Sequence, residues 1–265
     1  MENKNLDEIN TNEINKEAWN AYQEDYMKFN LMERPDYFEF FANGGIEWYG
    51  QEHILDMVGD VKGLKLLDTC CACDASQAFT WYNLGAIVTA CDITPKAIEI
   101  ASANAAKMNL NVEFVETDMQ KLTPISDNQY DIVFATYPCW VQDLNEACRN
   151  WHRVLKTGGK LLINAPHPIT DCIEAGENGF LIVYEDYNNP KPEIGENWDG
   201  TPLADRHGGW SGNLPSVGNS YRISDILNAV CDAGFIIKKT HETKSKEANI
   251  YLNRLPDMFT VLAVK

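Results

Sequence analysis

Residues 64–94 read LKLLDTCCACDASQAFTWYNLGAIVTACDIT and set the fold class of this 265-residue chain. A short apolar run, Leu64–Thr69, is bounded by small residues, as is typical of a buried strand. A helical segment, Ala75–Leu84, follows and ends at Gly85, a residue that favours a helix C-cap. A second apolar run, Ala86–Cys91, predicts another strand. Two strands joined by a helix in this way form a parallel βαβ unit with a right-handed crossover.

The alternation of strands and helices continues toward the C-terminus. Pro95–Met108 has the apolar spacing of an amphipathic helix, with Thr94 in the N-cap position. The pattern predicts an α/β fold: a Rossmann-like three-layer sandwich whose seven-stranded sheet is mostly parallel, with one antiparallel strand near the edge. The other expected strands are Val112–Val115, Asp131–Thr136, Lys160–Asn164, Phe235–Thr240 and Met258–Val264, and the other expected helices are Asp143–Leu155 and Ile223–Ala233.

The chain is expected to form one domain over residues 16–265, after a polar tail at 1–15 that we expect to be disordered. Helices within 16–60 are expected to cover the sheet. Residues 166–220 carry many Gly, Pro, Asn and Asp and show no clear period. Because a structureless loop of that length is uncommon inside a compact domain, we predict an insertion before the last helix that serves as a lid or substrate wall.

Composition narrows the classes of partner. The formal net charge of −17 disfavours a nucleic acid or an anionic membrane, so a small-molecule substrate is expected. The start of the chain, MENKNLDEINTNEINKEAW, lacks the basic and apolar parts of a signal peptide. The eight cysteines lack the even spacing of a secreted disulfide scaffold. We therefore expect a cytoplasmic protein, either a monomer or a homodimer.

Acidic residues follow three successive predicted strands: Asp68, Asp92 and Asp118. Ligands of open parallel sheets bind beyond the carboxyl ends of the strands. Asp92 comes 24 residues after Asp68, near the spacing at which an acidic side chain binds both hydroxyls of an adenosine ribose. A single carboxylate at a strand end is often only a helix cap, but three in register favour a nucleoside site.

Several segments resemble the class I S-adenosylmethionine-dependent methyltransferases. They are KGLKLLDTCCACDASQAFTWYNLGAIVTACDITPKAIEIASANA, VEFVETDMQKL, YDIVFATYPCWVQDL and RVLKTGGKLLI, in the order and spacing of that superfamily. The resemblance covers residues 16–165 and 221–265 and implies S-adenosylmethionine as cofactor, S-adenosylhomocysteine as product and no metal. It places the cofactor over residues 68–76, with Asp92 on the ribose and Asp118 near the adenine. The cofactor-binding residues that it implies are Asp68, Cys70, Ala72, Asp74, Gln77, Asp92, Ile93, Asp118, Met119 and Thr136.

The loop after the first strand departs from the family pattern. Cys70, Ala72 and Asp74 occupy its usual glycine positions, and non-glycine residues disfavour positive φ. We expect cofactor binding to be retained, with a shifted loop and lost binding as the alternative. The cluster of Cys70, Cys71 and Cys73 lacks the second Cys/His pair of a structural zinc site, so small buried side chains are the preferred interpretation. A dehydrogenase is disfavoured because the loop has no Gly-x-Gly-x-x-Gly pattern.

Candidate catalytic residues follow the fourth and fifth strands: Tyr137, and His167 between two prolines. His167 suits a substrate contact and a loop-structuring hydrogen bond equally well. Possible substrate contacts are Tyr22, Tyr26, Trp140, Arg206, His207 and Trp210, with core packing as the alternative for the first three and a solvated loop for the others.

The expected reaction is in-line methyl transfer to a small molecule, which depends mainly on alignment of the reacting atoms. Two alternatives stay open at this point. One is cyclisation or lysis of S-adenosylmethionine itself, and the other is a non-catalytic relative that keeps only the fold.

Overall fold

The computed structural model describes residues 11–47, 52–176, 180–190, 193–195, 214, 216–245 and 252–265. Arg206, His207 and Trp210 therefore lie outside the described residues. Within this part of the chain, no helix is both long and apolar enough to cross a bilayer.

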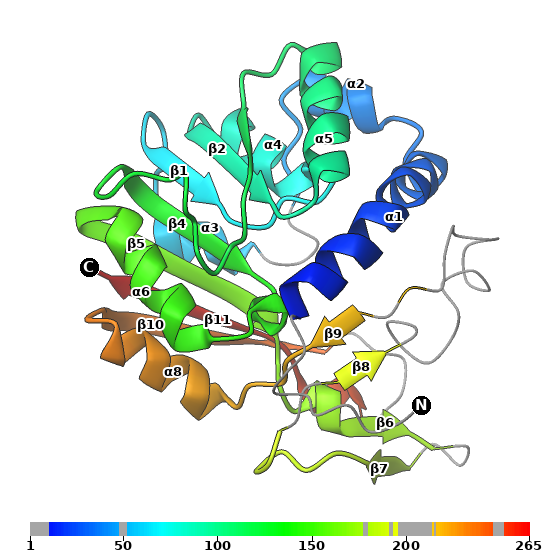
Figure 1. The fold of residues 1–265 in the computed structure, drawn as a ribbon, viewed down its shortest axis with the longest axis vertical. Coiled ribbons are helices and arrows are strands. Elements are labelled where there is room, and N and C mark those ends of the chain that lie inside the picture. The colour runs from blue at the N-terminus through cyan, green and yellow to red at the C-terminus, as the bar shows by residue number, and fades with distance from the viewer. Residues whose placement is uncertain are drawn as a thin grey trace.

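A seven-stranded sheet forms the centre of the molecule, in the order β10-β11-β5-β4-β1-β2-β3 (Figure 1). β11 pairs antiparallel with both of its neighbours, β10 and β5, whereas β1 to β5 pair parallel with one another. The predicted fold, including the single antiparallel strand next to the edge, is confirmed. The strands are β1 (Lys65–Asp68), β2 (Ile87–Asp92), β3 (Glu113–Glu116), β4 (Tyr130–Thr136), β5 (Leu155–Pro166), β10 (Ile236–Lys244) and β11 (Pro256–Val264).

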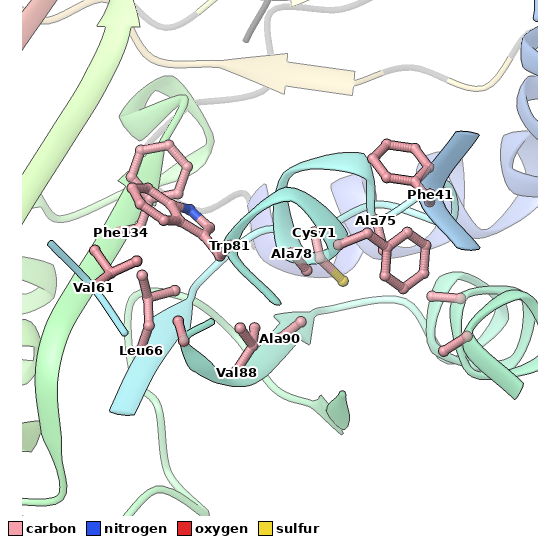
Figure 2. Packing of buried hydrophobic residues seen from close by; sticks show 14 of the residues in the cluster. Phe41, Val61, Leu66, Cys71, Ala75, Ala78, Trp81, Val88, Ala90 and Phe134 are labelled. Carbon is pink, nitrogen blue, oxygen red and sulfur yellow. The ribbon is translucent and has the colours of Figure 1, made fainter. Parts of the chain in front are cut away.

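Helices cover the sheet on both faces and enclose two hydrophobic cores. One core lies under α2 (Tyr37–Ala42), α3 (His53–Val58), α4 (Ser76–Asn83) and α5 (Pro95–Met108), and the other under α6 (Leu144–Val154) and α8 (Ile223–Asp232). In the first core Trp81 packs edge-on against Phe134 of β4, with ring centroids 5.3 Å apart, and Ala78 faces Val88 and Ala90 of β2 (Figure 2).

Local sequence explains where the best-defined helices begin and end. Thr94 Oγ1 accepts a hydrogen bond from the amide of Ala97 at 3.4 Å, and Pro95 occupies the first turn of α5. Asn109 ends α5 in the left-handed conformation. In α6 the buried residues recur every three or four positions, so one stripe of that helix faces the core.

The N-terminal cover consists of α1 (Thr11–Glu33), α2 and α3. α1 begins at Thr11, so residues 11–15 of the predicted polar tail form the first turn of this helix in the structure. The reason is that polar residues in its first turns bond to the rest of the domain: Thr11 Oγ1 donates to Gln142 Oε1 at 2.9 Å, and Asn15 bonds to the backbone of Val217. In Figure 1 α1 passes between α5 and β9.

The described parts of the predicted insertion contain regular structure that the sequence did not indicate. β6 (Ile173–Ala175) pairs with β7 (Leu181–Val183), and β8 (Glu193–Gly195) pairs with β9 (Ser216–Gly218), both antiparallel. β9 packs against α1 and the short helix η2 (Pro138–Trp140). That this insertion acts as a lid stays a prediction.

Candidate functional site

Asp68 ends the central strand β1 and is completely buried. Its Oδ1 accepts a hydrogen bond from the amide of Cys70 at 3.3 Å, and its Oδ2 has no hydrogen-bond partner among the described residues. Burial raises the pKa of Asp68 to about 7, and the charges of Asp92 and Asp74 add to the effect. A buried carboxylate oxygen without a donor calls for a ligand with a positive charge or a hydrogen-bond donor.

Asp92 ends β2 and ties that strand to the loop after β1. Its Oδ2 accepts from the amide of Ala72 at 3.1 Å, and its Oδ1 accepts from the amide and the hydroxyl of Thr94 at 2.9 and 2.8 Å. Burial raises the pKa of Asp92, against the effect of these hydrogen bonds. Asp92 therefore holds the β1–α4 loop (residues 69–75) against the end of β2.

The β1–α4 loop keeps the backbone shape that glycine usually provides. Ala72 has a φ of 53° and Ala75 a φ of 46°, both in the left-handed region. For a residue with a Cβ this conformation costs roughly 1–2 kcal/mol. The loop thus has a glycine-like turn at Ala72 without a glycine at that position.

Replacing Ala72 by glycine is expected to stabilise the protein by about 0.5–1 kcal/mol, because the relieved strain exceeds the added entropy of the unfolded chain. Urea denaturation would measure the change. The matched control is Ala103→Gly on the exposed side of α5, where the same exchange should cost about 1 kcal/mol. Equal losses for both variants would contradict strain at Ala72.

Asp74 occupies the third glycine position and is half-buried. Its Oδ2 accepts a hydrogen bond from the hydroxyl of Ser76 at 3.0 Å, and its carbonyl accepts one from the hydroxyl of Tyr37. Burial raises the pKa of Asp74 to about 6, and the charge of Glu47 adds to this. Asp74 also acts on its neighbours, since its charge is the main reason why the pKa of Tyr26 is raised. Tyr26, a predicted substrate contact, is therefore within electrostatic reach of Asp74, a predicted cofactor contact.

Asp118 follows β3 and lies beneath the first turn of α1. Its Oδ1 accepts from the amide of Gln120 at 2.8 Å, and its Oδ2 accepts from the side-chain amide of Asn12 at 2.8 Å. Burial raises the pKa of Asp118. The neighbouring Met119 is buried in the core under α6, where its carbonyl accepts from the indole of Trp151 at 2.9 Å.

α1 is fastened along the carboxyl ends of the strands by its polar side chains. Gln23 accepts hydrogen bonds from Cys73, at its side-chain oxygen from the amide (3.1 Å) and at its carbonyl from the thiol (3.2 Å). Asn20 Oδ1 accepts from the amide of Lys96 at the start of α5, at 3.0 Å. Asn12, Asn20 and Gln23 were not predictable from the sequence, because polar residues on an N-terminal helix carry no signal that separates such contacts from solvation.

Aromatic side chains of α1 and η2 form one cluster beside the loop. The ring of Trp19 lies 5.1 Å from that of Trp140 and 5.8 Å from that of Tyr22, both edge-on. The hydroxyl of Tyr22 donates to the carbonyl of Leu214 at 3.3 Å. Two of the predicted substrate contacts, Tyr22 and Trp140, are thus brought together through Trp19.

Tyr137 follows β4 with a φ of 51°, an unusual value for a residue with a bulky side chain. Its amide donates to the carbonyl of Asn164 at the end of β5, at 3.2 Å. Burial raises the pKa of the Tyr137 hydroxyl, with smaller effects from Cys139, Cys70 and Asp74. The hydroxyl therefore stays protonated at neutral pH and can donate a hydrogen bond.

His167 is buried, and both nitrogens of its ring are engaged. Nδ1 accepts from the amide of Ile169 at 3.2 Å, so the proton resides on Nε2, which lies 3.1 Å from Oε1 of Glu242 on β10. Of the two roles open at the sequence level, these contacts favour a loop-structuring histidine.

The remaining predicted cofactor residues lie at the same rim of the sheet. Cys70, Gln77 and Ile93 are half-buried, while Thr136 is buried with its hydroxyl unpartnered among the described residues. Burial raises the pKa of the Cys70 thiol well above its ordinary value, which argues against a reactive thiolate. Across the described ranges, no group of three His, Cys, Asp or Glu residues is arranged to hold a metal ion.

Comparison with known proteins finds similarity to methyltransferases. Residues 67–163 match the model of a family described as a methyltransferase domain. The chain is 28% identical over 125 residues to phosphoethanolamine N-methyltransferase 3 of Arabidopsis thaliana, covering 47% of this chain and 25% of that protein. It is 30% identical over 125 residues to the ubiquinone/menaquinone biosynthesis C-methyltransferase UbiE of Shewanella sp. (strain W3-18-1), covering 45% of this chain and 49% of that protein.

Among solved structures, an S-adenosylmethionine-dependent methyltransferase from Mesorhizobium loti shares the fold. The TM-score is 0.64 at 19% identity, over 84% of this chain and 100% of that chain. The match to the two curated relatives named above spans at most about half of their length. Residues 67–163 thus match a methyltransferase-domain family, and the chain shares the fold of S-adenosylmethionine-dependent methyltransferases of known structure.

Proposed function

We propose that the protein is an S-adenosylmethionine-dependent methyltransferase that acts on a small molecule. The observation that carries the proposal is the unpartnered, fully buried Oδ2 of Asp68 at the end of the central strand. A cation with hydrogen-bond donors at this position would remove the cost of that orphaned oxygen. The α-ammonium group of S-adenosylmethionine has both properties.

The other two carboxylates have the acceptor capacity that the rest of the cofactor needs. Each carboxylate oxygen can accept about two hydrogen bonds. Oδ2 of Asp92 uses one, for the amide of Ala72, which leaves a position for a ribose hydroxyl. Each oxygen of Asp118 likewise uses one, which leaves a position for the adenine amine. These three carboxylates therefore offer acceptor positions for the ammonium, ribose and adenine groups of the cofactor.

When bound, S-adenosylmethionine supplies a methyl group activated by a positive sulfur. The residues of this chain then have to align an acceptor with that methyl group and keep water away. We assign the alignment to Tyr137, whose protonated hydroxyl can donate to the acceptor, and the wall of the acceptor pocket to Trp19, Tyr22 and Trp140. We assign His167 to positioning the chain after β5, since neither of its ring nitrogens is available as a base.

Three observations support a small acceptor. The net charge of −17 opposes binding to polyanions. α1 lies over the strand ends, so the site is covered instead of open to a macromolecule. The names of the curated relatives refer to phosphoethanolamine and to quinone biosynthesis, which are small molecules. A cytoplasmic location and a monomeric or homodimeric state stay predictions.

Calorimetric titration of the full chain with S-adenosylmethionine and S-adenosylhomocysteine tests the proposal. We expect binding of S-adenosylmethionine in the micromolar range and release of S-adenosylhomocysteine only when an acceptor is added. Phosphoethanolamine and a demethylated quinol are the first acceptors to try, with mass spectrometry of the nucleoside product.

The same measurement separates the alternatives. Methylthioadenosine formed without an acceptor would indicate lysis or cyclisation of the cofactor. Binding of neither nucleoside would indicate a relative that keeps only the fold, and would overturn the proposal.

A further inference from the structure

The β1–α4 loop carries more negative charge than one cofactor ammonium requires. Asp68 ends β1 directly before this loop, and the loop itself holds Asp74 at a position where the superfamily usually has glycine. The carboxyl groups act on one another: the charges of Asp92 and Asp74 affect Asp68, and the charge of Glu47 affects Asp74. Glu47 is paired with the guanidinium of Arg34, whereas the carboxylate of Asp74 accepts a hydrogen bond from the neutral hydroxyl of Ser76.

Asp74 is held at the cofactor side of the loop by its neighbours. The hydroxyl of Ser76 fixes one carboxylate oxygen, and the hydroxyl of Tyr37 fixes the carbonyl. The loop at Asp74 is held under α1 and α2, because the amide of the preceding Cys73 donates to Gln23 of α1 and the carbonyl of Asp74 accepts from Tyr37 of α2. The charge of Asp74 also raises the pKa of two predicted site residues, Tyr26 on α1 and Tyr137 after β4. Asp74 therefore belongs to the loop over which the proposed cofactor would lie.

We propose that Asp74 is a specificity-determining residue that makes the site prefer S-adenosylmethionine to S-adenosylhomocysteine by charge. This inference rests on the proposed cofactor binding. The two nucleosides share the ammonium and carboxylate of the methionine part, but only S-adenosylmethionine carries the positive sulfur. A second carboxylate beside Asp68 attracts that additional charge and gives the neutral product no equivalent gain. The product therefore leaves more readily than it would from a loop with glycine at position 74.

The size of the effect follows from the interaction of two unit charges in a partly buried site. At an effective dielectric constant near 20, the attraction between a carboxylate and a positive sulfur several ångströms apart corresponds to a change in affinity on the order of tenfold to hundredfold. The preference depends on ionised Asp74, so it is expected to increase between about pH 5 and pH 8. The titratable or charged groups that face Asp74 are Tyr26 from α1, Tyr37 from α2, Glu47 with Arg34, Asp68 from β1, Cys73 from the loop itself and Tyr137 after β4.

Calorimetry on the full chain provides the test, with the ratio of the two dissociation constants as the readout. Asp74→Asn keeps the shape of the side chain, and Asp74→Gly restores the residue of the superfamily. We expect both variants to reduce the preference for S-adenosylmethionine at least tenfold, mainly by weakening S-adenosylmethionine. The control Asp232→Asn removes the same charge at the exposed end of α8 and should leave the ratio unchanged.

The wild-type protein offers a second measurement that needs no variant. Sinefungin carries an amine in place of the methylated sulfur, so it should bind more tightly than S-adenosylhomocysteine, and more so at pH 8 than at pH 5. An unchanged ratio in both Asp74 variants, with S-adenosylmethionine still bound, would overturn the role of Asp74 alone. A wild-type protein that binds none of the three nucleosides would overturn the proposed function as well.

Discussion

Asp68→Asn is expected to make the unliganded protein more stable and to weaken S-adenosylmethionine binding roughly 100-fold. The stability gain arises because the fold buries a carboxyl group that has a single hydrogen-bond donor. Asparagine keeps the oxygen that accepts from the amide of Cys70 and removes the charge. The loss of binding is the cost of removing one partner from a buried charge pair, typically 2–5 kcal/mol.

The stability effect has a defined dependence on pH. Folding raises the pKa of Asp68 from its ordinary value of 3.8 to about 7, so the folded state holds a proton that the unfolded state has lost. The wild type therefore loses stability as pH rises from about 4 to about 7, by up to about 4 kcal/mol, and Asp68→Asn does not. The advantage of the variant should grow by about 2–3 kcal/mol between pH 5 and pH 8.

Urea denaturation of both proteins at these two pH values, without ligand, measures the difference. Calorimetric titration with S-adenosylmethionine at pH 8 measures the binding. Asp127→Asn, which removes an exposed carboxylate far from the site, controls for net charge. A variant that binds the nucleoside as tightly as the wild type would show that Asp68 does not face the ammonium group.

Trp151→Ala should cost 3–5 kcal/mol of unfolding free energy, as is typical for truncation of a fully buried tryptophan. The indole fills the core between α6 and the sheet, and its N–H donates to the carbonyl of Met119. Its loss would leave a cavity and an acceptor without a donor. Because Met119 follows Asp118, the variant should also weaken the adenine side of the site.

Trp151→Phe separates the two contributions. The phenyl ring retains most of the bulk and loses only the hydrogen bond, so we expect a cost of about 1–2 kcal/mol. Urea denaturation gives both values, and nucleoside titration shows the effect on the site. A loss below about 1 kcal/mol for Trp151→Ala would mean that the core under α6 collapses around the missing ring.

Elements with a strong local signal were predictable from the sequence. Pro95–Met108 was expected from its period and its Thr94 cap, and α5 has those bounds. β5 begins at Leu155, five residues before the predicted Lys160, because Leu155 pairs with Tyr130. That pairing joins residues distant in the chain, and a Gly-Gly turn read locally gives no sign of it.

In the candidate site, too, the residues with a local sequence signal were predictable, and the contacts between distant residues were not. The acids at the ends of β1 and β2 and after β3 were predictable, since strand order brings consecutive strand ends to one rim. The hydrogen bond of His167 to Glu242 was not, because 75 residues separate them and β10 meets β5 only through β11. Asn12 and Gln23 were missed for a similar reason: their partners, Asp118 and Cys73, are chosen by the docking of α1.

The fastening of α1 makes the nucleoside site and the insertion mechanically dependent on each other. Asn12 holds Asp118, Gln23 holds Cys73, and between them Asn15 bonds twice to Val217 of β9. A displacement of α1 that admits or releases a nucleoside would have to break or carry along the contacts to β9. Exchange of the nucleoside and rearrangement of the insertion beside the acceptor pocket should therefore occur together. The nucleoside and the acceptor would then bind in a fixed order.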